Sequence, residues 1–129
     1  MYTFTKEERL KHKKDIDRLF SEGNRFNLDP FLVLYSSNPL ASKYPARVLI
    51  SVPKKRIKSA VDRNLIKRRI REAYRLHKNP FYEILKQQLR FCSLALIYTS
   101  VKIAEYKEVE EKIILILERL QREYEKGNQ

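Results

Sequence analysis

The chain has 129 residues, and its 28 Lys and Arg outnumber its 16 Asp and Glu, which gives a formal net charge of +12 at pH 7. This length suits one domain, and 43% apolar residues with only two glycines exclude a disordered or fibrous chain. Apolar stretches are too short to span a bilayer, no leader-like segment opens the chain, and the single cysteine excludes an internal disulfide and a cysteine-rich zinc cluster. We expect one cytoplasmic domain over residues 1–129, with its charge as the main indication of a partner.

The first half of the chain predicts a short helix followed by two strands. Ile16, Leu19 and Phe20 have helical spacing and Gly23 follows, so residues 13–22 should be helical. Residues 31–35 and 48–52 are rich in β-branched, aromatic and aliphatic side chains, with turn-forming residues between them. We expect these two strands to form an antiparallel pair.

The second half predicts two helices, a buried strand and a long final helix. Residues 63–77 have helical periodicity, and Asn79 and Pro80 should end this helix and begin a shorter one, from residue 81 to about 90. Residues 92–99 are apolar on both faces, which predicts an inner strand. From Val109 to Tyr124 the apolar residues again follow a helical period, so the last helix should cover the sheet. Strand, basic helix, short helix and strand together predict a βαβ crossover in an α/β or α+β domain.

Most of the charge excess lies in one segment. Between Lys54 and Lys78 there are eleven basic and two acidic residues, a net +9, whereas the other 104 residues carry only +3. On a helix over residues 63–77, Tyr74 and six polar side chains share one arc of roughly 140°. We call the six the basic face: Arg63, Asn64, Lys67, Arg68, Arg71 and Arg75. Because guanidinium groups bind phosphate oxygens bidentately, such a face indicates a polyanionic partner.

Other readings of the charges remain open at this point. A basic face can serve solubility alone, and a ribosomal protein or RNA chaperone would use it for binding alone. A DNA-binding regulator would place the helix in a major groove, but no short helix and tight turn precede it. No catalytic or metal-ligating set surrounds His12 or His77, which we expect at the surface and in the core, and the acids Glu7 and Glu8 should lie in solvent.

An ordered string within the basic segment resembles the Arg-Asn signature of the bacterial ribonuclease P protein subunit. The string comprises Arg63, Asn64, Ile66, Lys67, Arg68, Ile70, Arg71 and Glu72, and it follows Ser51, Val52, Lys54 and Lys55 at a strand end. The resemblance extends over roughly residues 9–124, with Arg9, Leu10 and Lys11 ahead of the first helix. It departs from the family pattern at Ile16, at Leu49 and over residues 56–59.

This resemblance implies a fold and a function. The fold would be an α+β sandwich: a small, mostly antiparallel sheet of about four strands, packed with helices and containing a left-handed crossover around the basic helix. The function would be to assist a catalytic RNA in the endonucleolytic removal of the 5′ leader from precursor tRNA. The partners would be the RNA subunit and precursor tRNA, with no membrane or protein partner implied. Magnesium held by the RNA would do the chemistry, so the protein would have no catalytic or metal-binding residues of its own.

Two binding surfaces follow from this reading. The RNA-subunit surface would combine the basic face with the helix entrance: Lys54, Lys55, Arg63, Asn64, Lys67, Arg68, Arg71 and Arg75. The leader surface would lie between the first helix and the sheet, with Lys11, Lys14 and Arg18 for phosphates and Phe20, Phe31 and Tyr35 for stacking on bases. Alternation places Phe31 and Tyr35 on one strand face and Leu32 and Leu34 on the other. If the leucines face the core, the aromatic residues face this groove.

Overall fold

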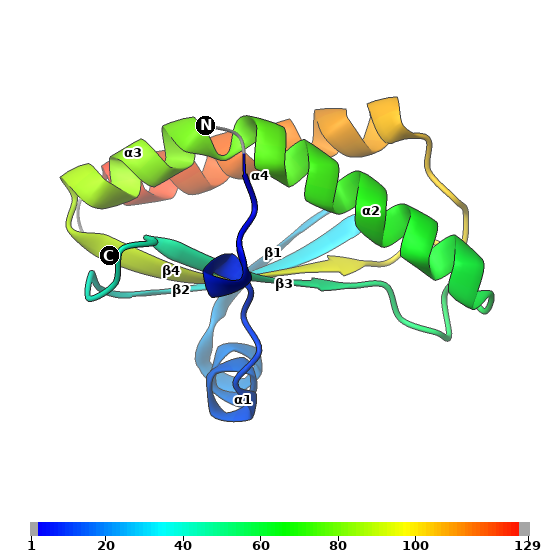
Figure 1. The fold of residues 1–129 in the computed structure, drawn as a ribbon, viewed down its shortest axis with the longest axis horizontal. Coiled ribbons are helices and arrows are strands. Elements are labelled where there is room, and N and C mark those ends of the chain that lie inside the picture. Colours follow the sequence, from blue (N-terminus) through cyan, green and yellow to red (C-terminus); the bar gives the residue numbers. More distant parts are fainter. Residues whose placement is uncertain (1–2, 127–129) are drawn as a thin grey trace.

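The computed structural model describes residues 3–126 as a four-stranded sheet with helices on both faces (Figure 1). The strands are β1 (Asn24–Leu28), β2 (Phe31–Pro39), β3 (Ala46–Ser51) and β4 (Arg90–Tyr98). A short 3-10 helix, η1 (Lys6–Glu8), precedes α1 (Lys13–Glu22), and the later helices are α2 (Ala60–His77), α3 (Asn79–Gln87) and α4 (Tyr106–Glu125). The predicted α+β class is confirmed. None of the described helices is both long and apolar enough to cross a membrane.

The sheet has the strand order β1-β2-β4-β3, with antiparallel pairs β1–β2 and β2–β4 and a parallel pair β3–β4. The inner strand at residues 92–99 is confirmed as β4, and the crossover is confirmed because α2 and α3 connect the parallel neighbours β3 and β4. The antiparallel pairing of residues 31–35 with 48–52 is wrong. β4 separates β2 from β3, because its apolar side chains are buried on both faces.

Two elements escape the sequence patterns, η1 and β1. Only Phe26 of β1 is buried, and the residues beside it are polar, so the strand lacks an apolar alternation. It forms by pairing with β2 across a two-residue turn, Asp29 and Pro30, whose peptide bond is cis. η1 is a single turn ahead of α1, too short to give a periodicity.

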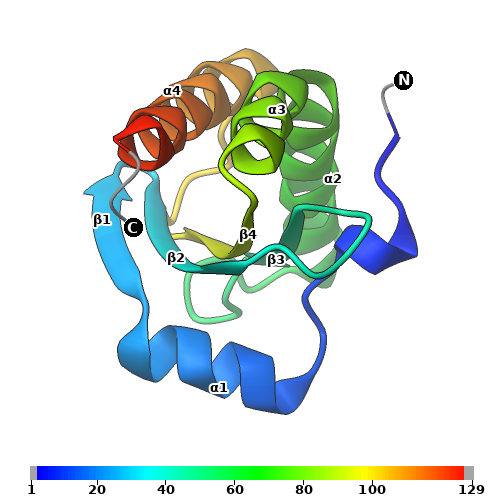
Figure 2. The ribbon, with the colours of Figure 1, turned by 90° about the vertical axis from the view of Figure 1, so that its left-hand side faces the viewer.

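The face of the sheet under α2, α3 and α4 contains the main hydrophobic core (Figure 2). Phe31, Val33 and Tyr35 of β2 point to this face, where they join apolar residues from α2 and α4. α4 therefore covers the sheet as predicted. α1 lies against the opposite face, where Leu19 packs with Leu34 and Ala95 in a smaller cluster.

Gly23 ends α1 at a point where the helix and β2 approach closely. A Cβ atom at this position would lie 2.4 Å from the carbonyl oxygen of Leu19 and 3.3 Å from that of Tyr35. The φ of Gly23 is −72°, a value open to any residue. The glycine is therefore required for the close approach and not for a left-handed backbone.

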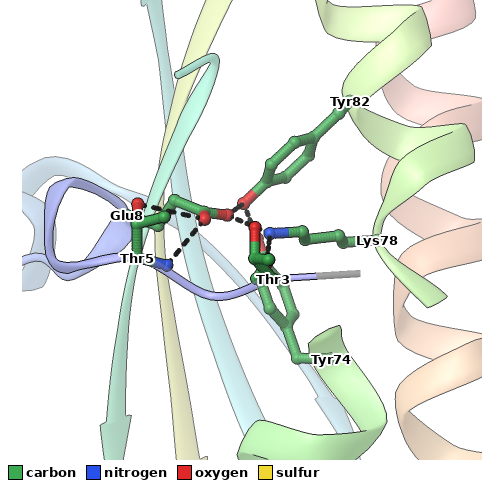
Figure 3. Close-up of polar contacts among 6 residues, drawn as sticks. All are labelled: Thr3, Thr5, Glu8, Tyr74, Lys78 and Tyr82. Atoms are coloured by element: carbon green, nitrogen blue, oxygen red, sulfur yellow. Dashed lines mark hydrogen bonds and ion pairs between the residues drawn. The ribbon is translucent and has the colours of Figure 1, made fainter. Parts of the chain in front are cut away.

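A buried ion pair fixes the N-terminal segment, residues 3–9, to the junction of α2 and α3 (Figure 3). The side chain of Glu8 pairs with that of Lys78, and both residues are buried. Tyr82 donates a hydrogen bond of 2.7 Å to one Glu8 carboxylate oxygen, and the Thr5 amide donates one of 2.9 Å to the other. Lys78 also donates to the Thr3 carbonyl, and Tyr74 bonds the Tyr82 hydroxyl. We call these residues the N-terminal clasp: Thr3, Thr5, Glu8, Tyr74, Lys78 and Tyr82.

The expectation that Glu8 is solvent-exposed is wrong, because its carboxylate is buried and fully bonded. Burial by itself would raise the pKa of the Glu8 carboxyl, but the hydrogen bonds from Lys78, Thr5 and Tyr82 hold this pKa below its ordinary value. The ionised carboxylate is thus the form that the fold stabilises.

Replacing Glu8 by Gln should lower the free energy of unfolding by about 3 kcal/mol at neutral pH, because it leaves the Lys78 charge buried without its partner. In the wild type, the folded-state pKa of Glu8 lies below the unfolded value of about 4.3, so its contribution is present at neutral pH and is lost as the pH falls through and below that value. Chemical denaturation of both proteins from pH 7 to pH 3 measures this difference.

Glu7→Gln is the matched control, since Glu7 is the exposed neighbour on the same turn. The ion pair contributes nothing to stability if the two glutamine variants unfold alike at every pH.

Candidate nucleic-acid interface

α2 is fixed to the domain by one side, which leaves the other for a partner. Ile66, Ile70 and Ala73 are buried in the main core, and the Ser59 side chain caps the helix by accepting a 3.3 Å hydrogen bond from the Asp62 amide. Tyr74, predicted on the basic arc, is fully buried. The N-terminal segment covers it, since the Phe4 ring packs edge-to-face on Tyr74 with 5.8 Å between centroids.

The side chains of the basic face differ in their exposure and in whether they already form ion pairs. Asn64 and Arg68 are exposed, Lys67 and Arg71 are half-buried, and none of the three cations forms an ion pair within residues 3–126. Arg75 pairs with Glu72 at 2.6 Å. Of the cations of the basic face, Arg68 is the most exposed, and it lies in the middle of α2.

Arg63 has an internal role in addition to its charge. Its guanidinium Nη1 donates to the carbonyl oxygens of Ile57 at 3.0 Å and Lys58 at 2.8 Å. Ile57 is buried in the main core, and the preceding turn exposes Lys54 and Lys55. Arg63 therefore closes the loop that presents these two lysines at the entrance of α2.

Arg71 lies among other positive charges. Burial, together with the charges of Arg9 and Arg68, lowers the pKa of Arg71 below its ordinary value. Arg9 reaches this position from the N-terminal segment, where it bridges to Val48 of β3. An anion bound at this point would relieve the repulsion among the arginines.

The second predicted surface, beside α1, is only partly formed as expected. Lys11, Lys14 and Arg18 are exposed, and Phe20 is 42% exposed, so these four residues are accessible. Phe31 and Tyr35 are not, because both are buried on the opposite face of the sheet, under α4. The Tyr35 hydroxyl donates a 3.2 Å hydrogen bond to Glu123 of α4.

The face of β2 that was predicted to point into the core is the wrong one. Alternation separated the aromatic residues from Leu32 and Leu34 correctly, but the leucine face is the one that α1 covers. The larger side chains are on the other face, where three helices create the larger core. Phe31 and Tyr35 are therefore structural residues in this fold.

A hollow of about 200 Å³ between α1 and the sheet brings in residues that the sequence did not single out. Arg18 of α1 lines it together with Ser36, Arg47, Phe91 and Ser93 of the strands. The Arg47 guanidinium lies 5.8 Å from the centre of the Phe91 ring. Strand alternation could have identified Arg47 from the sequence, because Arg47 stands between the buried Ala46 and Val48 and therefore faces α1.

The titratable groups outside the two predicted surfaces include Cys92 and His77. No group of three or more His, Cys, Asp or Glu in this part of the chain is placed to hold a metal ion. Burial raises the pKa of the Cys92 thiol to about 12, so the thiol stays protonated. His77, expected in the core, is half-exposed and its Nε2 lies 2.8 Å from the Glu110 carboxylate, which joins α2 to α4. The arrangement suits binding of a polyanion.

Replacing Arg63 by Ala should lower the free energy of unfolding by about 1–2 kcal/mol, because two hydrogen bonds to loop carbonyls are lost. Arg68→Ala is the control and should change it by less than about 0.5 kcal/mol, since Arg68 is exposed and its side chain forms no hydrogen bond or ion pair with residues 3–126. Denaturant melts of the protein alone measure both values. Equal stability of the two variants would contradict the structural role of Arg63.

Comparison with known proteins points to one family. A family model described as Ribonuclease P matches residues 4–121. The ribonuclease P protein component of Porphyromonas gingivalis is 33% identical over 109 residues, 84% of this chain and 80% of the relative. That of Dictyoglomus turgidum is 37% identical over 119 residues, 92% of this chain and 93% of the relative.

Solved structures agree with the sequence relatives. The RNase P protein of Staphylococcus aureus superposes with a TM-score of 0.67 at 25% identity, over 87% of this chain and 94% of that one. The RNase P protein from Thermotoga maritima gives a TM-score of 0.64 at 26% identity, over 87% of this chain and 96% of that one. The similarity therefore extends over nearly the whole of both chains.

Proposed function

Because this chain belongs to the bacterial ribonuclease P protein family, we infer that it is the accessory protein subunit of a ribonucleoprotein endoribonuclease that matures the 5′ end of tRNA. The observation that carries this conclusion is the family match over residues 4–121. The partner is an RNA subunit, which performs the catalysis. The single free cysteine, Cys92, suits the reducing cytoplasm as the place of this reaction.

The basic face and the loop before α2 are the proposed contact with the RNA subunit. Lys67, Arg68 and Arg71 support this assignment, because they lie on one side of a helix that the core fixes. Lys54 and Lys55 extend the charge along the entrance of α2. Neutralising RNA phosphates with these side chains releases counterions and lowers the repulsion between the RNA subunit and its substrate.

The groove beside α1 is the proposed site for the 5′ leader of precursor tRNA. Lys11, Lys14 and Arg18 supply positive charge, and Phe20 supplies an accessible ring. Arg47 and Phe91 add a cation and a ring from the sheet side of the hollow that Arg18 lines. Aromatic side chains stack on any base, so this site would hold leaders with little sequence preference.

Hydrolysis in this proposal requires magnesium ions, which the RNA subunit would hold and which would activate the attacking water. The carboxylates of the described residues offer no cluster for such an ion. In this proposal the residues of this chain bind and orient the two RNAs.

The alternative functions fit the structure less well. A helix-turn-helix regulator requires a short helix just before the recognition helix, but β3 and a loop precede α2. A ribosomal protein or RNA chaperone would use the same charges, and the family membership argues against it.

The function is tested by incubating the protein with a precursor tRNA and the cognate catalytic RNA at low magnesium concentration. The protein should restore cleavage and should tighten binding of precursor over mature tRNA, because it contacts the leader. A basic peptide of the same net charge is the control for nonspecific screening. The assignment fails if the protein does no more than the peptide.

Phe20→Ala should weaken binding of a long-leader substrate by about 1–3 kcal/mol and leave binding of a leaderless tRNA unchanged, because one stacking contact is lost. Tyr35→Phe is the control on the buried face and should affect neither substrate. Binding constants from titrations of the reconstituted holoenzyme measure the effect. An equal loss for both substrates would remove Phe20 from the leader site.

A further inference from the structure

A second hollow, of about 260 Å³, lies between the N-terminal segment and α2. Its lining residues are Phe4, Arg9, Arg68, Arg71, Glu72 and Arg75. Phe4 and Arg9 belong to neither surface described above, and they come from a segment far from α2 in the sequence. The hollow is therefore a place where two distant parts of the chain contribute to one site.

Positive charge predominates in this hollow. Arg9, Arg68 and Arg71 form no ion pair with any of residues 3–126. Glu72 also lines the hollow, but its carboxylate is held by Arg75 at 2.6 Å. Burial, and then the nearby charges of Arg9 and Arg68, lower the pKa of Arg71 below its ordinary value.

The position of Arg9 is fixed from two directions. Its backbone bridges to Val48 of β3, and the next residue, Leu10, donates a 3.0 Å hydrogen bond to the Val48 carbonyl. Its guanidinium lies 5.7 Å from the centre of the Phe4 ring, and Phe4 in turn packs on Tyr74. Arg9 is thus held at the hollow before any ligand arrives.

The N-terminal clasp maintains this arrangement. Glu8 directly precedes Arg9, and its carboxylate is bonded to Lys78 and Tyr82 at the junction of α2 and α3 (Figure 3). Lys78 also bonds the Thr3 carbonyl on the other side of Phe4. The clasp therefore anchors the segment at both ends of the stretch that lines the hollow.

We propose that this hollow binds a phosphodiester group of RNA, with Arg9, Arg68 and Arg71 as donors and Glu8 as a positioning residue. Three guanidinium groups around one concavity provide the planar, bidentate donors that phosphate oxygens accept. The RNA is the catalytic subunit or the precursor tRNA, so this inference rests on the proposed function. It extends the RNA-binding surface from α2 to the N-terminal segment.

The direct test is Arg9→Ala, with Lys6→Ala as the control. Lys6 is an exposed cation of the same segment and does not line this hollow. Arg9→Ala should weaken RNA binding about tenfold and reduce the slope of log K against log salt by about 1, whereas Lys6→Ala should change affinity less than threefold or so. Equal losses in the two variants would overturn the proposal, since only net charge would then matter.

Titrations with the RNA subunit alone and with precursor tRNA bound to the holoenzyme distinguish the two sources of the phosphate. A loss in the first titration assigns the hollow to the RNA subunit, and a loss confined to the second assigns it to the precursor. No loss in either overturns the proposal.

The positioning role of Glu8 is tested by a double-mutant cycle. Glu8→Gln should weaken RNA binding by itself but add little to Arg9→Ala, because both changes act through the same guanidinium. The measurement is made at a temperature where circular dichroism shows both variants folded. Additive losses would mean that Glu8 acts on binding independently of Arg9, and an unchanged affinity of Glu8→Gln would mean that it acts on stability alone. Either result would remove Glu8 as the positioning residue of this site.

Sulfate tests the anion site without RNA, and this test does not depend on whether Glu8→Gln folds. Sodium sulfate should raise the melting temperature of the wild type and of Lys6→Ala more than that of Arg9→Ala, because a bound anion stabilises the folded state. Equal shifts in the three proteins would overturn the site. If the wild type fails to support cleavage while the sulfate effect depends on Arg9, the proposed function fails and the anion site stands.

Discussion

β4 lies at the centre of the sheet with its apolar side chains buried on both faces, and the positions of the binding surfaces follow from this burial. β3 pairs with it in parallel, so the chain must return over the sheet through α2 and α3. α2 thereby places Ile66 and Ile70 in the core and its charged side toward solvent. The opposite face of β4 is covered by α1 and by Leu10 just before it, and the groove beside α1 is formed there.

The apolar periodicity of the sequence predicted the individual helices and most of the strands. The helices α1 to α4 and the strands β2, β3 and β4 have apolar repeats of their own, and all were anticipated within a few residues. Strand pairing was not, because a choice between β2 and β4 as the neighbour of β3 depends on which faces are covered, and no single segment contains that information. The same limit explains the wrong placement of Phe31 and Tyr35. Alternation shows that they share one face of β2, but it does not show which helices cover that face.

The buried Glu8 shows why long-range charge pairing escapes a sequence reading. Glu8 and Glu7 are equivalent by local pattern, but only Glu8 meets Lys78 when the N-terminal segment crosses the α2–α3 junction. Tyr74 was misplaced for the same reason, since Phe4 covers a helix side that would otherwise be open. Both errors arise from the N-terminal segment, residues 3–9, which carries no apolar repeat. The proposed contact residues on α2 itself could be grouped from the sequence because helix geometry alone places them on one side.

The net charge of the basic segment overstates what an RNA can contact. Lys78 is buried against Glu8, Arg75 is paired with Glu72, and Arg63 is bonded to loop carbonyls. Arg69 is likewise bonded to the Ala104 carbonyl. Among the described residues, the cations of α2 with neither an ion pair nor a hydrogen bond through their side chains are Lys67, Arg68 and Arg71, and Arg9 joins them from outside the segment. A charge count thus identified the class of partner, while the fold determines which few charges are presented to it. Because the engaged cations hold the loop, the helix and the N-terminal segment in place, they preorganise the free ones, and preorganisation reduces the entropy lost on binding.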